Sequence, residues 1–351
     1  MDDVVVIGAG QAGLAAGYHL RQAGLRFTIL EANAGAGGSW PHYYDSLVLF
    51  SPARYSSLPG LPFPGDPDHY PTRAEVVDYL REYAAKYELP IVPNAPVTTV
   101  QRDGNLFRVS TASGRTYPAR AVIAATGSFG KPYMPDLPGR AEFRGRVLHA
   151  FDYRNPEPFA GQRVVVVGSA NSAVQIAVEL VEVARVTLAT RSRIIFFPQK
   201  ILGKDGHFWL RVTGLDRVGI LRDQSTPVVD AGRRYSAAVR AKRPDARRMF
   251  TRFTASGIVW RDGSEEEVDS VIFATGYRPN VQYLAALDGA LDPNGRPRQR
   301  AGVSRTVRRL YFVGLSGQRN FASATLRGVG PDAALVVKHI RRSLQSPAAH
   351  S

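Results

Sequence analysis

Two stretches of this sequence share one pattern, in which a run of β-branched residues meets a turn of small residues at the expected start of a helix. Residues 4–13 read VVVIGAGQAG, and residues 164–173 read VVVVGSANSA. A strand followed at once by such a turn and a helix opens a βαβ unit, and these units build parallel sheets covered by helices. The pattern therefore predicts an α/β fold that contains two copies of one unit.

The hydrophobic periodicity continues both copies in the same way. The expected strand, helix and strand span 4–7, 14–23 and 27–30 in the first copy, and 164–167, 174–183 and 186–189 in the second. Within the first copy we also expect a helix at 73–87 and an antiparallel meander of strands at 97–102, 107–111 and 115–117. Each copy then reaches a buried strand that stops at Ala-Thr-Gly, the first at 121–125 and the second at 270–274.

The order of these elements predicts how the domains are arranged. A strand at 310–313 and a helix at 330–344 are too short for a third domain, so we expect them to complete the first sheet. The fold class is then two Rossmann-like dinucleotide-binding domains, the second inserted into the first. Their expected limits are 1–155 with 280–351 for the first domain and 156–279 for the second, with an irregular segment at 194–250.

The composition of the chain argues against several classes of function. The 351 residues include no cysteine, which excludes disulfide relays and thiolate metal sites, and we expect no metal site. The net charge is +15, but the arginines are spread along the chain, so a nucleic acid partner is not expected. No apolar run approaches the roughly 20 residues that span a bilayer. We expect a cytoplasmic protein without stable membrane insertion.

The first turn has the spacing of a dinucleotide site. Gly8 permits a tight turn, Gly10 lets backbone N–H groups approach a pyrophosphate, and Gly13 lets the helix pack on the strand. Glu31 stands at the end of the next strand, where a carboxylate can accept hydrogen bonds from a ribose. These residues fit NAD or FAD. The stretch 37–40 (GGSW), the meander and the Ala-Thr-Gly return favour FAD.

The second turn differs where a cofactor would lie. Ala170 and Ala173 replace the second and third glycines, and a methyl group near the pyrophosphate path suits a cofactor that exchanges. The next strand ends in Thr190-Arg191-Ser192-Arg193 instead of a carboxylate. Arginine clamps phosphate and so favours a 2′-phosphate, which predicts NADPH over NADH, with NADH still possible. The alternative is that both arginines simply face solvent.

A third motif lies ahead of the second turn. Residues 143–153 read FRGRVLHAFDY, in which Phe143, Gly145, His149 and Tyr153 match the FxGxxxHxxx(F/Y) signature of flavin-containing monooxygenases. The chain resembles that family over nearly its whole length, and its short bacterial members most of all. The related Baeyer–Villiger enzymes end the signature in Trp, so Tyr153 argues mildly against them. We expect His149 to orient the linker between the domains and assign it no proton transfer.

The resemblance implies an FAD-dependent monooxygenase. In that family NADPH reduces FAD, O₂ adds to the flavin as a hydroperoxide, and a soft nucleophile such as a sulfide or an amine takes one oxygen atom. It implies FAD contacts at Gly8, Gly10, Gln11, Ala12, Gly13, Glu31, Gly38, Ser39, Trp40, Val97, Thr126, Gly127 and Thr325. It implies NADP contacts at Gly168, Ser169, Ala170, Asn171, Ser172, Arg191, Arg193, Thr275 and Gly276.

The chain departs from the family at one position beside the flavin. Many members carry an Asn ahead of a proline, and the matching stretch 47–52 (LVLFSP) puts Phe50 there. A phenyl ring donates no hydrogen bond, so part of the NADPH is expected to be lost as H₂O₂. A shift of the alignment by one residue would give the polar role to Ser51. Phe50, Ser51 and Asn171 are therefore the candidate catalytic surroundings of the flavin and nicotinamide.

Segment 194–250 and the function leave alternatives open. The segment could be a lid over the substrate mouth, a contact in a homodimer or an interfacial membrane helix, and its glycines and prolines favour the first two. The protein could instead be an NAD(P)H:flavin oxidoreductase that passes electrons to a protein partner, a Baeyer–Villiger-type oxygenase, or a non-enzymatic flavin-gated sensor. A small nucleophilic substrate and O₂ are the partners that the monooxygenase reading requires.

Overall fold

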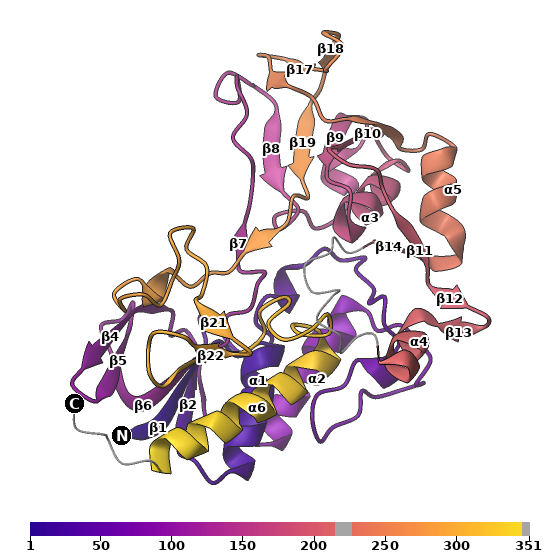
Figure 1. Ribbon diagram of the computed structural model, residues 1–351. Coiled ribbons are helices and arrows are strands. Elements are labelled where there is room, and N and C mark those ends of the chain that lie inside the picture. The colour runs from indigo at the N-terminus through magenta and orange to yellow at the C-terminus, as the bar shows by residue number, and fades with distance from the viewer. Residues whose placement is uncertain (215–226, 346–351) are drawn as a thin grey trace.

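The computed structural model describes residues 1–214 and 227–345 and divides them between two lobes (Figure 1). The first lobe is built on a nine-stranded sheet among these residues, and the second on a five-stranded sheet. The first sheet has the order β21-β22-β23-β6-β1-β2-β3, with β4 and β5 branching from β6. The order of the second is β15-β10-β9-β19-β8, and all its neighbouring strands are parallel.

Strand β1 (Asp2–Ile7) is the centre of the first lobe. It pairs in parallel with β2 (Phe27–Leu30) on one side and with β6 (Thr116–Ala124) on the other. Because successive side chains of a strand point to opposite faces, Val4 and Val6 pack in one apolar cluster and Val5 and Ile7 in another. The β-branched run therefore supplies both faces of a buried strand.

Helices cover one face of this sheet and the meander covers the other. Next to Val4 and Val6 lie α1 (Gln11–Gln22), α2 (Arg73–Lys86) and α6 (Leu326–Gln345). On the opposite face lie β4 (Val97–Asp103) and β5 (Leu106–Thr111). Short strands complete the sheet, namely β3 (Ile91–Val92), β21 (Gln299–Arg300), β22 (Val303–Ser304) and β23 (Leu310–Phe312).

Two sequence expectations for this lobe need correction. The separate strands expected at 115–117 and 121–125 are one strand, β6, which pairs with β5 through its first half and with β1 through its second. Pro118 lies in the gap between the two expected strands, and it is part of this single strand. Helix α6 starts at Leu326, earlier than the expected residue 330, and Pro331 lies inside it. As expected, β23 joins the first sheet beside β6.

The second lobe follows the second turn. Strand β9 (Arg163–Val167), helix α3 (Asn171–Leu180) and strand β10 (Arg185–Thr190) form its βαβ-type opening. The rest of the sheet is β8 (Arg146–His149), β15 (Asp245–Arg248) and β19 (Ser270–Phe273). A small antiparallel sheet is made by β16 (Arg252–Phe253), β17 (Gly257–Val259) and β18 (Glu265–Glu267).

Two strands of this sheet lie outside the places that the sequence suggested. Strand β8 precedes the linker expected at 155–158 and pairs with β19. Strand β15 falls inside the segment expected to be irregular and extends the sheet beside β10. Its sequence, Asp-Ala-Arg-Arg, has no apolar run, because an edge strand can expose one side to water.

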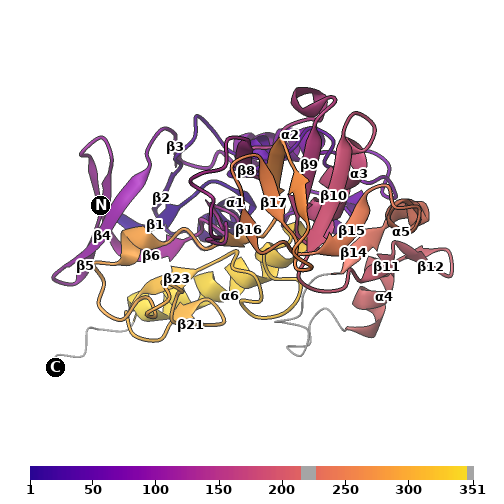
Figure 2. The ribbon, with the colours of Figure 1, turned by 90° about the horizontal axis from the view of Figure 1, so that it is seen from above.

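Segment 194–250 is otherwise built from short elements at the edge of the second lobe. They are β11 (Phe196–Pro198), β12 (Lys200–Ile201), β13 (Lys204–Asp205), α4 (Gly206–Thr213), β14 (Val228–Asp230) and α5 (Arg234–Arg240). Residues 215–226 of the segment lie outside the described residues. Figure 1 shows α4 below the second sheet, on the side of the start of α6, and Figure 2 shows α4, α5 and β12 at the edge of the second lobe. None of the helices in the two described ranges is long and apolar enough to cross a membrane.

Two chain passages connect the lobes. One carries β7 (Lys131–Pro132) and follows the first Ala-Thr-Gly, and the other carries β20 (Tyr277–Arg278) and follows the second. These two strands pair with each other in an antiparallel ladder (Figure 1). The matching positions of the two Ala-Thr-Gly stops thus bring both connections together between the lobes.

Candidate active site

A cavity of about 580 Å³ lies where the carboxyl ends of the first sheet face the second lobe. Turns after parallel strands gather at this edge, which is where open α/β sheets bind ligands. Apart from Gly13, every residue expected to contact FAD lines it: Gly8, Gly10, Gln11, Ala12, Glu31, Gly38, Ser39, Trp40, Val97, Thr126, Gly127 and Thr325. Asn171 and Ser172 from the second turn also line it, as do Phe50 and Ser51. One cavity therefore brings the two turns together.

Close packing requires glycine at two positions of the first turn, Gly8 and Gly13. Gly8 has φ +103°, a conformation that side chains disfavour, and a Cβ there would lie 3.0 Å from the Ala125 carbonyl oxygen. A Cβ at Gly13 would lie 1.8 Å from the Gly8 carbonyl oxygen. Gly13 thus allows α1 to pack on the strand and does not itself reach the cavity. This is the packing role that the spacing predicted for it.

Gly10 and Gly38 meet across the mouth of the turn. A Cβ at Gly38, where φ is +56°, would lie 2.7 Å from the Gly10 Cα. No side chain caps the start of α1, whose N-cap residue is Gly10. The uncapped N–H groups and the positive end of the helix dipole suit a pyrophosphate. Because side chains here would fill the cradle, the residues present fit the dinucleotide FAD.

Glu31 is buried at the end of β2, where it lines the cavity. Its Oε2 accepts a hydrogen bond of 2.6 Å from the Ala9 N–H, and its Oε1 accepts from the Asn33 N–H at 2.9 Å and from the Asn33 amide at 2.8 Å. A carboxylate has about four acceptor positions, so these three bonds fix its orientation and leave capacity for a ribose hydroxyl.

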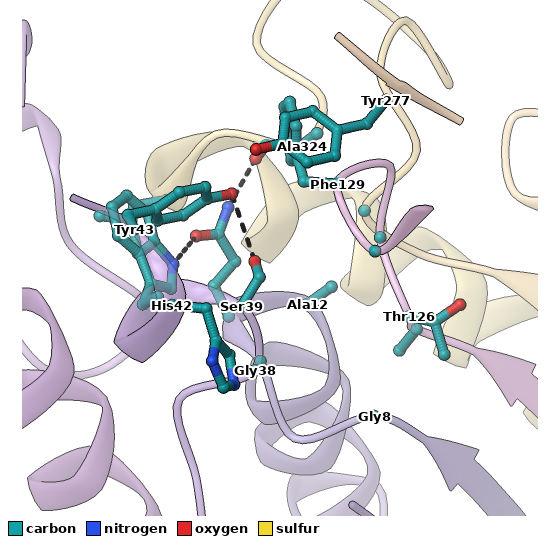
Figure 3. Close-up of a pocket in the computed structure, with 18 of the residues that line it drawn as sticks. Gly8, Ala12, Gly38, Ser39, His42, Tyr43, Thr126, Phe129, Tyr277 and Ala324 are labelled. Atoms are coloured by element: carbon teal, nitrogen blue, oxygen red, sulfur yellow. Dashed lines mark hydrogen bonds between the residues drawn. The ribbon is translucent and has the colours of Figure 1, made fainter. Parts of the chain in front are cut away.

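Side-chain hydrogen bonds hold the rest of this wall, and Figure 3 shows them. The Trp40 indole donates to the Gln11 side-chain oxygen at 2.9 Å, and the Gln11 amide donates to the Ala324 carbonyl at 2.5 Å. Burial raises the pKa of Tyr43, whose hydroxyl lies 3.3 Å from that of Ser39. Tyr43 therefore keeps its proton at neutral pH.

The second turn has a different local structure. Gly168 has φ +150°, and a Cβ there would lie 2.6 Å from the Ala274 carbonyl oxygen and 2.8 Å from the Ala173 Cβ. Asn171 begins α3, and both ends of its amide are engaged. Its nitrogen donates to the Pro227 carbonyl at 3.1 Å, and its oxygen accepts from the Val229 N–H at 2.8 Å. Through these two hydrogen bonds Asn171 also connects the start of α3 to β14.

The remaining residues expected for NADP lie outside the cavity lining. These are Gly168, Ser169, Ala170, Arg191, Arg193, Thr275 and Gly276. Ser169 and Ser192 join the two loops at the end of the second sheet, with their hydroxyls 3.3 Å apart. Arg191 and Arg193 are exposed there. Arg248 was not among the residues expected from the sequence. It ends β15, and its guanidinium donates to the Arg191 carbonyl at 2.9 Å. Arg248 is therefore a third arginine beside this loop.

The signature residues hold the second lobe and its connection together. Phe143 packs in that lobe's apolar core, and a Cβ at Gly145 would lie 2.6 Å from the Asp269 carbonyl oxygen. The Tyr153 hydroxyl donates to Glu179 at 2.8 Å. All three therefore have packing or positioning roles.

His149 is fixed by two backbone groups. Its Nδ1 accepts from the Phe151 N–H at 3.0 Å, so the ring proton lies on Nε2 and is donated to the Gly276 carbonyl at 3.1 Å. Burial lowers the pKa of His149, and the ring stays neutral at neutral pH. This geometry agrees with a role in orienting the connection, since Gly276 directly precedes β20.

Phe50 and Ser51 both lie at the cavity, and the Phe50 ring contacts α4 there. The Ser51 hydroxyl lies 2.9 Å from that of Ser56, which has its own carbonyl acceptors. The Phe50 ring stacks on His207 of α4 with centroids 5.9 Å apart and an interplanar angle of 17°. Tyr55 stacks on the same ring at 6.3 Å.

His207 was not predicted from the sequence, and it lines the cavity. Asp205 accepts from its Nδ1 at 2.8 Å and from the Tyr70 hydroxyl at 2.7 Å. Burial alone would raise the pKa of Asp205, but the hydrogen bonds from His207 and Tyr70 lower it overall. These contacts dock the start of α4 on the first lobe. The sequence signal closest to His207 was the aromatic and basic character of segment 194–250, which suggested a lid over the substrate mouth or a homodimer contact.

Comparisons with known proteins agree with this arrangement. The family model described as pyridine nucleotide-disulphide oxidoreductase matches residues 5–314. An uncharacterized oxidoreductase CzcO-like of Geobacillus kaustophilus (strain HTA426) is 38% identical over 345 residues, which cover 96% of this chain and 98% of that protein. A probable indole-3-pyruvate monooxygenase YUCCA8 of Arabidopsis thaliana is 30% identical over 382 residues, covering 96% of this chain and 88% of that protein.

Among solved structures, the flavin-containing monooxygenase from Stenotrophomonas maltophilia matches with a TM-score of 0.87 and 38% identity, covering 98% of this chain and 100% of that one. This similarity confirms the expected fold of two dinucleotide-binding domains and the resemblance stated from the signature. Disulfide chemistry, which the family description mentions, has no thiol to carry it here, because the chain has no cysteine. The chain belongs to the pyridine nucleotide-disulphide oxidoreductase family and is an oxidoreductase of its flavin-containing monooxygenase branch, whose cofactors are FAD and NADPH.

Proposed function

We propose that the enzyme uses NADPH and O₂ to oxygenate a small soft nucleophile, a sulfide or an amine, and loses part of its NADPH as H₂O₂. One observation supports this most: residues of the first turn, the start of α3 and Phe50 line the same cavity. FAD in the first turn and a nicotinamide approaching from the second would meet in that space. The apolar ring of Phe50 lies there without a hydrogen to donate.

The protein's part in this reaction is binding, orientation and exclusion of water. The chemistry that bound FAD and NADPH would supply is hydride transfer and the activation of O₂. Gly10 and the start of α1 would bind the pyrophosphate, and Glu31 the ribose. Phe50 and His207 would close the cavity on its α4 side, where their rings stack. A closed site of this kind favours oxygen transfer over side reactions with water.

Oxygenation of methyl phenyl sulfide under ¹⁸O₂ tests this function. We expect a sulfoxide that carries one ¹⁸O atom, formed with NADPH consumption, together with measurable H₂O₂. The readout is mass spectrometry of the product beside NADPH and H₂O₂ assays. NADPH oxidation that yields only H₂O₂ with sulfides and amines would favour the reductase alternative. Conversion of a cyclic ketone to a lactone, with sulfides untouched, would favour a Baeyer–Villiger enzyme.

The loop after β10 should set the choice between NADPH and NADH. We propose that Arg191 and Arg193 bind the 2′-phosphate, because both are exposed beside the second turn. Replacing both by alanine is expected to raise the KM for NADPH about tenfold or more, since a charge-assisted hydrogen bond is worth about 1.5–3 kcal/mol. The KM for NADH should change little.

Steady-state kinetics with both nucleotides measure this effect. Arg261→Ala, which removes a charge from an exposed turn of the same lobe, is the matched control and should leave both KM values as they are. A wild type that prefers NADH, or a double variant that keeps the NADPH preference, would show that Arg191 and Arg193 do not bind the 2′-phosphate of NADPH.

A further inference from the structure

A second cavity, of about 590 Å³, adjoins the one that holds the cofactor-binding turns. Its walls come from the turn at 53–57, from α4, from the loop at 319–322 and from the start of α6. Tyr55 and Arg327 line both cavities. The two spaces therefore share a wall, and the second lies where residues of α4 and of the first lobe meet.

Arginines dominate the second cavity. Four of its lining residues are Arg54, Arg211, Arg319 and Arg327, and none of its lining residues within 1–214 and 227–345 is acidic. Two of them are held in place from outside the lining. Asp68 pairs with Arg54 at 2.7 Å, and the buried Asp332 pairs with Arg319 at 2.8 Å. Arg54 and Arg319 are thus already ion-paired, and Arg211 and Arg327 add further positive charge to the lining of this cavity.

Helix α4 contributes to both cavities. His207 lines the first and Arg211 lines the second. Residues four apart lie on the same face of a helix, so the face of α4 that closes the cofactor cavity also carries a cation beside it. A ligand could then place an anionic end at Arg211 and its other end toward His207 and Phe50.

We propose that this arginine cavity binds the carboxylate of an acidic substrate whose reactive end reaches the first cavity. Guanidinium groups match carboxylates in bidentate geometry, which fixes the orientation as well as the charge of a ligand. The proposal rests on the proposed oxygenation and narrows its substrate class. The enzyme would prefer soft nucleophiles that carry an acid group over neutral ones.

A matched pair of aryl sulfides tests the preference. (Phenylthio)acetate carries a carboxylate, and methyl phenyl sulfide does not. The wild-type holoenzyme should show the lower KM for (phenylthio)acetate. In Arg211→Gln, the ratio of that KM to the KM of methyl phenyl sulfide is expected to rise about tenfold, the usual scale for a lost charge-assisted hydrogen bond. Arg211→Lys should give an intermediate ratio, and Arg261→Gln should give the wild-type ratio.

Binding of phenoxyacetate gives a readout that does not depend on oxygenation, because its ether oxygen replaces the sulfur. Calorimetric titration of the wild-type holoenzyme should detect binding that weakens with added salt and weakens about tenfold in Arg211→Gln. Absence of any binding, or equal binding by wild type and Arg211→Gln, would overturn the carboxylate site. If neither methyl phenyl sulfide nor (phenylthio)acetate is oxygenated but phenoxyacetate binds as expected, the proposed function fails and the carboxylate site stands.

One further outcome separates the substrate from the cofactor as the source of the anion. A nicotinamide cofactor also carries phosphates, which arginines bind by the same geometry. A rise in the KM for NADPH in Arg211→Gln, with the sulfide ratio unchanged, would assign the cavity to the cofactor and overturn the proposal.

Discussion

Replacing Gly10 by valine is expected to abolish FAD binding and leave a colourless protein, whereas the wild type should purify yellow with one tightly held FAD. In the protein itself a Cβ at Gly10 would meet the Gly38 Cα at 3.5 Å, an ordinary contact. The fold should therefore tolerate the substitution. The branched side chain would instead occupy the space where backbone N–H groups at the start of α1 must approach a pyrophosphate.

The measurement is flavin absorbance per protein, combined with circular dichroism and thermal unfolding of the flavin-free protein. Gly35→Val is the matched control, because Gly35 is exposed in the neighbouring loop and a Cβ there would meet nothing within 4 Å. We expect it to keep its flavin. A folded Gly10→Val protein with a full complement of FAD would refute the assignment of the first turn.

Gly13 shows why the three glycines of this turn cannot be treated alike. A Cβ there would lie 1.8 Å from a backbone oxygen of Gly8, so Gly13→Ala is predicted to disturb the packing of α1 on β1 as well as the cofactor. The spacing of the motif predicted both roles, because each depends on neighbouring residues and on the standard geometry of a strand, a turn and a helix.

Dependence on neighbouring residues in the sequence also explains which parts of the fold could be predicted. The β-branched runs at β1 and β9 are buried on both sides, and a continuous apolar run is the pattern that predicts such a strand. Strand β15 could not be recognised in this way, because it is an edge strand whose residues are mostly polar. Strand β6 was expected as two strands, at 115–117 and 121–125, since the sequence does not show that one strand pairs in an antiparallel ladder and in a parallel one.

The site was predicted least well where distant segments meet. His207 is more than 150 residues from Phe50 in the sequence, and its stacking on that ring depends on how the start of α4 docks on the first lobe. Asn171 was expected beside the nicotinamide. The sequence motif does not predict that its amide makes hydrogen bonds to the backbone of Pro227 and Val229. The roles of the site residues in cofactor binding stay predictions.

The last prediction concerns Phe50, which should decide how much of the NADPH is spent on product. Its ring lines the cavity and stacks on His207, but it donates no hydrogen bond to charge that develops there. A preorganised donor at such a position is worth about 2.7–4 kcal/mol in other enzymes. We therefore expect the wild type to oxygenate a simple sulfide slowly, with a substantial yield of H₂O₂ per NADPH.

Phe50→Asn should lower the H₂O₂ yield and raise the sulfoxide formed per NADPH. Two effects compete in this variant, because losing the ring contact with His207 costs about 0.5–1.5 kcal/mol of α4 docking, less than the donor is worth. Phe50→Leu separates them: it removes the ring without adding a donor, and it should raise the H₂O₂ yield above that of the wild type. Parallel assays of sulfoxide, H₂O₂ and NADPH measure all three proteins.

A wild type that couples nearly all its NADPH to sulfoxide would contradict this reading of Phe50. The stabilising donor would then have to come from elsewhere, and the structure limits the choice. Ser51 is the neighbour that a one-residue shift of the alignment would select, but its hydroxyl already lies 2.9 Å from that of Ser56. Ser56 has the Pro52 carbonyl as an acceptor at 3.0 Å, so Ser51 is the natural donor within that pair. A donor supplied by bound NADP⁺ would therefore be the better candidate, and coupling would then depend on how long NADP⁺ stays bound after NADPH has given up its hydride.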